Sequence, residues 1–156
     1  ISVLLAVGDG SFAAATSHPV ISEPRTLSVG DIDGDGALDV VAASYTFPNL
    51  KVLLGDGAGG FADKPGYVPF PIGIYSVVVA DLDHDGAQDI VGVDSDLHEV
   101  VVIRSIGPGK LPTYEHIPVG LIPVDLLVRD LDGDGALDVA TVDSGSGSVT
   151  ILRADP

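Results

Sequence analysis

The chain has 156 residues, 46% of them hydrophobic, and a formal net charge of −16. That length fits one domain or part of one, and glycine, proline or aspartate interrupts every apolar stretch before it reaches membrane-spanning length. A surface this acidic disfavours nucleic acid and anionic membranes as partners. Because there is no cysteine, disulfides and thiol catalysis are excluded.

Three similar acidic segments organise the sequence. They read DIDGDGALD at 31–39, DLDHDGAQD at 81–89 and DLDGDGALD at 130–138. Their starting positions, 31, 81 and 130, give a repeat of about 50 residues, a spacing that indicates a repeat architecture.

Each acidic segment presents the oxygen ligands of a hard cation. Carboxylates stand at positions 1, 3, 5 and 9, a backbone carbonyl is available at position 7, and glycine at position 6 permits a sharp reversal. Calcium fits best, because it takes about six to eight oxygens and tolerates irregular geometry, whereas magnesium demands a near-octahedral shell and zinc prefers cysteine and histidine. The sequence therefore predicts about three Ca²⁺ ions per chain, held by Asp31, Asp33, Asp35, Ala37, Asp39, Asp81, Asp83, Asp85, Ala87, Asp89, Asp130, Asp132, Asp134, Ala136 and Asp138.

The flanks of these segments predict strands. An EF-hand loop would carry glutamate at position 12, where this chain has Ala42, Gly92 or Thr141. Short runs rich in β-branched residues stand on both sides of each segment, as in TLSVG before the first and VVAAS after it. Each loop is therefore expected to join two strands of a hairpin.

A four-strand pattern follows in each repeat. First strands are expected before the loops from Pro24, Ile74 and Pro123, second strands at about 38–43, 88–93 and 137–142, and third strands at about 50–54, 99–104 and 148–153. Glycine-rich turns at 55–61 and 107–111 lead to a fourth strand, on which Phe61 and Leu111 hold one common position. The N-terminal ISVLLAVGDGSF matches this second half alone, so the repeat limits are about 1–22 (half a blade), 23–72, 73–121 and 122–156 of a single partial domain.

The predicted fold is all-β. Twenty glycines and 11 prolines are spread along the chain, and no long segment keeps a helical period. An antiparallel unit of four strands repeated about every 50 residues is typical of β-propeller blades, of which this chain has about three, whereas parallel β-helix repeats are much shorter.

The chain resembles the FG-GAP/VCBS repeat family, the calcium-loop propellers related to the integrin α-subunit head. DIDGDGALDVV, DLDHDGAQDIV, DLDGDGALDVA and LGDGAGGF carry the resemblance, together with the repeat spacing. It implies that the calcium loops support structure on one rim of the propeller and that ligands bind on the opposite rim. His84, where the family usually has glycine, and the poor match of GPGKL are departures from its pattern.

The blade count leaves ring closure open. Propellers close with roughly four to eight blades, so slightly more than three are expected to need completion by association or by the remainder of a larger propeller. Among oligomers we expect a homodimer. No signal-peptide pattern is visible, and a mature chain, a fragment and an engineered chain all fit the sequence.

No catalytic signature is visible, and we expect no enzyme activity. His18, His84, His98 and His116 share no repeat position, and no nucleophile motif is present. We expect His84 to face solvent and not to act as a ligand.

The loops between second and third strands differ from one another. Tyr45 and Phe47 in the first of them offer surface for stacking on a sugar or anchoring a protein, or for packing between blades.

Three functions fit these patterns. The first is a secreted or cell-surface calcium-binding recognition module, for adhesion or for binding carbohydrate or protein. The second is the non-catalytic propeller portion of a secreted hydrolase or lyase, and the third is an architectural fragment that self-assembles. Calcium loops of modest affinity suit the millimolar calcium outside cells, so we expect an extracellular location.

Overall fold

The computed structural model describes residues 1–46, 49–63, 73–104 and 113–155. The prediction of an all-β fold is confirmed, because every regular element in this part of the chain is a β-strand. Within the same residues, no helix is long and apolar enough to cross a membrane.

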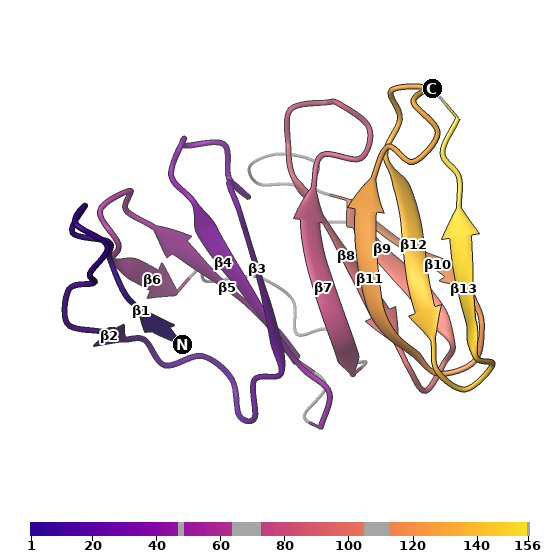
Figure 1. The fold of residues 1–156 in the computed structure, drawn as a ribbon, viewed down its shortest axis with the longest axis horizontal. Helices are drawn as coiled ribbons and strands as arrows, with labels where there is room; N and C mark the ends of the chain where they lie inside the picture. Colours follow the sequence, from indigo (N-terminus) through magenta and orange to yellow (C-terminus); the bar gives the residue numbers. More distant parts are fainter. Residues whose placement is uncertain (47–48, 64–72, 105–112, 156) are drawn as a thin grey trace.

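Three antiparallel sheets correspond to three propeller blades (Figure 1). Blades 1 and 2 have four strands each, in sequence order, and blade 3 has three. Blade 1 contains β3 (Thr26–Gly30), β4 (Asp39–Ser44), β5 (Asn49–Gly55) and β6 (Phe61–Asp63); blade 2 contains β7 (Ile74–Ala80), β8 (Asp89–Asp94), β9 (Glu99–Arg104) and β10 (Thr113–Pro118); blade 3 contains β11 (Pro123–Arg129), β12 (Asp138–Asp143) and β13 (Ser148–Leu152).

The N-terminal segment forms a small hairpin. Strands β1 (Ser2–Val3) and β2 (Thr16–Ser17) pair antiparallel, with a further bridge between Ala6 and Phe12. The rings of His18 and Phe61 pack edge to face with their centroids 5.4 Å apart. This contact joins the hairpin to β6, the outer strand of blade 1. The hairpin thus has the antiparallel strand–turn–strand arrangement of β5 and β6 in blade 1, and its assignment as half a blade stays a prediction.

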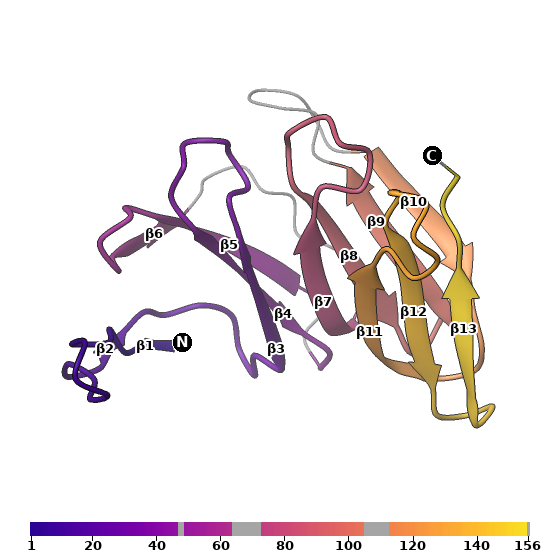
Figure 2. The ribbon, with the colours of Figure 1, turned by 45° about the horizontal axis from the view of Figure 1, so that its top comes forward.

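The first strands of the blades lie side by side. Strand β7 contacts β3 on one side and β11 on the other, and the remaining strands fan outward from these three (Figures 1 and 2). The described blades form an open arc and not a closed ring, in agreement with the blade count.

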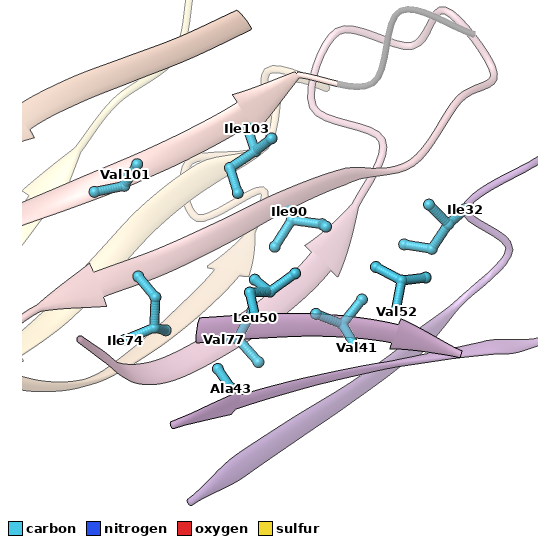
Figure 3. Close-up of a cluster of buried hydrophobic side chains, with 10 residues drawn as sticks. All are labelled: Ile32, Val41, Ala43, Leu50, Val52, Ile74, Val77, Ile90, Val101 and Ile103. Atoms are coloured by element: carbon cyan, nitrogen blue, oxygen red, sulfur yellow. The ribbon is translucent and has the colours of Figure 1, made fainter. Parts of the chain in front are cut away.

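Apolar residues fill the space between neighbouring blades. Alternate residues of β4 and β5 face blade 2, where they meet the opposing face of β7, β8 and β9 (Figure 3). A second cluster joins the other face of blade 2 to blade 3. Because blade 2 is covered on both faces, its central strands β8 and β9 are almost continuously apolar, as sheets buried on both sides require.

The strand predictions agree with the structure to within about two residues. The second strands begin at the position-9 aspartates, one residue after the predicted starts. The acidic loops join antiparallel neighbours, as expected. Phe61 opens β6, whereas Leu111, the glycine-rich turn before it and Phe47 lie outside the described residues.

Candidate metal centres

The three acidic loops lie at one end of the blades. Loop 1 (31–39) connects β3 to β4, loop 2 (81–89) connects β7 to β8, and loop 3 (130–138) connects β11 to β12. The three loops appear together at the top of Figure 1. The β4–β5, β8–β9 and β12–β13 turns lie at the opposite end, because successive strands are antiparallel. We call these two ends the loop rim and the turn rim.

The reversal of each loop depends on two residues with positive φ. Position 6 is glycine in all three loops, with φ of 88°, 90° and 98°, which confirms the predicted role of Gly36, Gly86 and Gly135. Position 4 also has positive φ, which was not predicted from the sequence. Gly34 and Gly133 occupy this position in loops 1 and 3, while His84 occupies it in loop 2 with φ 57°. The glycines at position 4 of two loops could have indicated the positive φ of this position.

The carboxylate at position 1 organises the backbone of its own loop. Asp31 accepts hydrogen bonds from the N–H groups of Gly34, Asp35 and Gly36 at 2.8, 3.2 and 2.9 Å. Asp130 repeats two of these bonds and Asp81 repeats the bond from position 6. Each loop therefore wraps around its first aspartate.

The carboxylate at position 5 fixes the exit of the loop. In every loop its Oδ1 accepts the N–H of the alanine at position 7, at 2.7 or 2.8 Å. The pairs are Asp35–Ala37, Asp85–Ala87 and Asp134–Ala136. The alanine carbonyls were predicted as ligands, and that role stays a prediction.

The carboxylate at position 9 is buried and joins three parts of a blade. Asp39 accepts the N–H of Ile32 through Oδ2 and the N–H of Gly55, at the end of β5, through Oδ1. Asp138 makes the same two bonds, to Leu131 and Ala154. In blade 2, Asp89 accepts from Leu82 and from the guanidinium of Arg104. The aspartate spacing predicts only a metal role for these residues and does not reveal the hydrogen bonds to the neighbouring strands.

Three carboxylates converge in each loop. In loops 1 and 3 they belong to positions 1, 3 and 9, and in loop 2 to positions 1, 3 and 5, with one oxygen from each lying within 4.8 Å of the others. The groups are Asp31, Asp33 and Asp39; Asp81, Asp83 and Asp85; and Asp130, Asp132 and Asp138. The structure thus brings nine of the twelve predicted carboxylates into such groups, while Asp35, Asp89 and Asp134 stand outside them.

The donor set of these groups fits a hard cation. Only carboxylate oxygens converge, and three anions this close repel one another unless a positive charge separates them. In loop 2, Oδ1 of Asp81 is buried and accepts no hydrogen bond from the described residues. A buried carboxylate oxygen without a donor is costly, and a cation bound there would satisfy it.

Two arginines approach the loop rim. Arg153 lies 2.7 Å from Asp132 in loop 3, and Arg104 lies 3.6 Å from Asp83 and 3.1 Å from Asp89 in loop 2. The equivalent position in blade 1 is Leu54. Loops 2 and 3 therefore have partial charge compensation from a residue that repeat 1 lacks.

His84 also links two loops. Its side chain is exposed, as expected, and it belongs to none of the carboxylate groups. Its Nε2 lies 3.0 Å from the carbonyl oxygen of Gly135 in loop 3, so the residue bridges blades 2 and 3 as well as facing solvent.

The turn rim contains an aromatic contact between blades. The hydroxyl of Tyr45 donates to Asp96 in the β8–β9 turn at 2.8 Å, and its ring packs edge to face against Tyr75. The guanidinium of Arg25 lies 3.5 Å above the Tyr75 ring. The hydrogen bond to the Asp96 carboxylate raises the pKa of Tyr45. Of the two roles left open for Tyr45, these contacts favour packing between blades.

Comparison with known families gives two overlapping matches. The family model described as FG-GAP-like repeat matches residues 31–92 and again residues 81–142. Each match runs from one acidic loop through the next, and together they cover more than half of the chain. No curated protein matches the sequence.

Proposed function

Because the chain belongs to the FG-GAP-like repeat family, we propose that it is a calcium-stabilised β-propeller module that binds a ligand and has no catalytic role of its own. The observation that carries the metal part is the convergence of three carboxylates in each of three equivalent loops. The recognition part is supported by the difference between the two rims: the loops repeat almost residue for residue, whereas the turns opposite them do not.

Each loop would hold one Ca²⁺ ion. The converging carboxylates would be the main ligands, and the position-7 carbonyls of Ala37, Ala87 and Ala136 would add one oxygen each. The ion would supply positive charge where the fold gathers acidic groups, which stabilises the folded state because the unfolded chain has no such site.

The calcium affinity expected of such loops points to an extracellular protein. The loops are solvent-exposed over positions 4 to 6, and extracellular calcium modules bind with dissociation constants of about 10⁻⁴–10⁻³ M. Calcium at about 2 mM would then stabilise the fold by roughly 0.6–1.8 kcal/mol per site.

The ligand would bind on the turn rim. Its turns carry exposed side chains of different chemistry in each blade, including Asp96 and Leu97 in blade 2 and Ser144 and Ser146 in blade 3. Such variation on a common framework is how scaffolds acquire binding specificity. A glycan or an extracellular protein is the ligand class that we propose.

Calcium titration tests the metal assignment. Isothermal calorimetry of metal-free protein should give about three equivalents, and melting in 2 mM calcium should occur several degrees above melting in EDTA, with 2 mM magnesium as the matched control. Equal melting temperatures in calcium and in EDTA would refute the assignment of the loops as calcium sites.

A glycan array probes the turn rim separately. We expect binding that weakens when calcium is removed. Binding in saturating calcium should also weaken in the turn-rim variant Asp96→Ala, while the loop-rim variant Arg153→Leu leaves it unchanged under the same condition. A calcium-stabilised protein that binds no glycan and no cell-surface protein would leave an architectural role in place of recognition.

A further inference from the structure

The outer face of blade 3 carries apolar residues at positions that are buried in blade 2. In blade 2, the residues that face blade 3 include Val91, Val93, Val100 and Val102, none more than 2% exposed. The residues 49 positions later, on the same face of β12 and β13, are Ala140, Val142, Val149 and Ile151. Val142, Val149 and Ile151 are 48%, 63% and 52% exposed.

The loop rim shows the same difference. Position 2 of loop 1 is Ile32, which is 4% exposed and packs in the cluster between blades 1 and 2. Leu82, at the same position in loop 2, packs against the cluster between blades 2 and 3. Leu131 in loop 3 is 45% exposed. The outer face of β12 and β13 is therefore an apolar blade-facing surface that the described residues leave uncovered.

The opposite end of the arc carries a matching surface. Leu27 and Val29 of β3 are 53% and 47% exposed on the face of blade 1 that points away from blade 2. The residue equivalent to Leu27 is Val77 in blade 2 and Leu126 in blade 3, and each is buried against the preceding blade. On the same face of blade 1, Val40, Ala42 and Leu53 are no more than 5% exposed, so the open part of this face is its β3 side. The exposed parts of the two faces thus match the two sides of one more blade interface.

The edge of blade 3 is also open. Strand β13 pairs with β12, and among the described residues no fourth strand follows it, whereas β9 of blade 2 is covered by β10. An open edge presents unpaired backbone N–H and C=O groups that can accept another strand. The N-terminal hairpin offers strands of the outer-blade type on blade 1.

We propose that the outer face of blade 3 binds the Leu27 face of blade 1 in a second copy of this chain, head to tail and reciprocally. The partner is identified by continuity with the two interfaces already present, since both free faces keep the residue types and strand register of those interfaces. Two copies contribute six blades, within the range of roughly four to eight in which propellers close. The N-terminal hairpin of each copy then lies beside the β13 edge of the other, and the two identical contacts close a twofold ring.

The mass of residues 1–156 in solution tests this proposal. Light scattering during size exclusion should give twice the chain mass at micromolar concentration, with no larger species. A folded monomer at all concentrations would overturn the proposal and indicate that blades outside this chain cover the two faces. Open polymers would overturn the closed ring as well.

Variants then locate the interface. Val142→Lys and Leu27→Glu should each weaken the dimer at least tenfold without unfolding the chain, because both side chains are exposed within one copy. Leu97→Lys is the matched control, since Leu97 is 58% exposed on the turn rim, away from both faces. If L97K dissociates the dimer as strongly as V142K, the assigned face is wrong.

A mixture of two variants distinguishes head-to-tail contact from self-pairing of one face. Combining V142K with L27E should restore a dimer, because one interface then joins lysine to glutamate and the other keeps both native residues. If the mixture stays monomeric while each variant remains folded by circular dichroism, the head-to-tail arrangement is refuted. The test does not depend on the proposed ligand.

Discussion

The two ends of the second strands differ in how they are held. Each second strand begins with a buried aspartate, Asp39, Asp89 or Asp138, and in all three blades that aspartate accepts the N–H of loop position 2. Each also ends with a buried polar residue, but there the residue type and its partners change. The same contact to a buried aspartate therefore repeats on the loop rim of all three blades, which indicates a structural role for that rim. On the turn rim the contacts differ from blade to blade, so its residues are free to vary.

The turn-rim residues show that variation in detail. Asp94 accepts the N–H groups of Asp96 and Leu97 within its own turn. Asp143 instead accepts the hydroxyls of Thr141 and Thr150, and blade 1 has Ser44 at this position. Both rims thus bury a polar residue at the end of each second strand. Only on the loop rim does that residue have the same hydrogen-bond partner, the N–H of loop position 2, in all three blades.

The largest expected effect comes from removing a position-9 aspartate. Asp39→Ala leaves the buried N–H of Ile32 and the half-buried N–H of Gly55 without their acceptor, and we expect a loss of about 3 kcal/mol in the free energy of unfolding in EDTA. Asp94→Ala is the matched control on the turn rim. It should cost about 1 kcal/mol, because water can reach the freed N–H groups of that turn. Urea denaturation measures both, and an equal or larger loss for D94A would contradict the difference between the rims.

The second prediction concerns the independence of the three loops. Asp33→Asn, Asp83→Asn and Asp132→Asn should each remove about one equivalent of calcium, because the hydrogen bonds of each loop close mainly on itself. The stabilisation by 2 mM calcium should fall by roughly 1 kcal/mol in each variant. Calorimetry that shows all three equivalents lost from one substitution would indicate a shared site.

A smaller effect is expected from the arginine beside loop 3. Arg153→Leu copies the residue of blade 1 and removes a cation that competes for the Asp132 carboxylate. Because this ion pair is solvent-exposed, its removal should tighten calcium binding by about two- to fivefold at one site. Arg25→Leu removes the same charge from the turn rim and controls for net charge. Equal changes in the two variants would show that only overall charge matters.

Much of the loop rim could be predicted from the sequence, because its chemistry is local. The aspartate spacing, the hairpins and the reversal at Gly36 depend on residues within about ten positions of one another. The bond from Asp39 to Gly55 spans 16 residues and appears only when β4 and β5 are paired. The positive φ of His84 was missed because histidine, unlike glycine, does not mark such a position.

Contacts between blades could not be predicted, because they depend on how whole sheets stack. Tyr45 meets Tyr75 and Asp96 across the interface of blades 1 and 2, and no periodicity in the sequence pairs these residues. Val149 is a further example, because a valine is expected to be buried from its residue type alone. It is exposed here because no described residue covers the outer face of blade 3.

The smallest expected effect concerns Tyr45 on the turn rim. Tyr45→Phe removes the hydrogen bond to Asp96 and keeps the ring contact with Tyr75, so the melting temperature at pH 7 should fall by roughly 1–3 °C. The bond raises the pKa of Tyr45 above the ordinary value of 10.0, which means that the folded state keeps its proton where the unfolded state loses it. The stabilisation by this tyrosine is therefore fully present below pH 10 and is lost as the pH rises through the folded-state pKa.

The difference in melting temperature between wild type and Y45F should shrink above pH 10 for the same reason. Tyr75→Phe is the control, because it keeps an aromatic ring beneath Arg25 and leaves the Tyr45–Asp96 bond in place. A wild-type minus Y45F difference that stays constant from pH 7 to pH 11 would show that the hydroxyl of Tyr45 does not hold the two turns together. That result would leave the turn rim of blades 1 and 2 joined by ring packing alone.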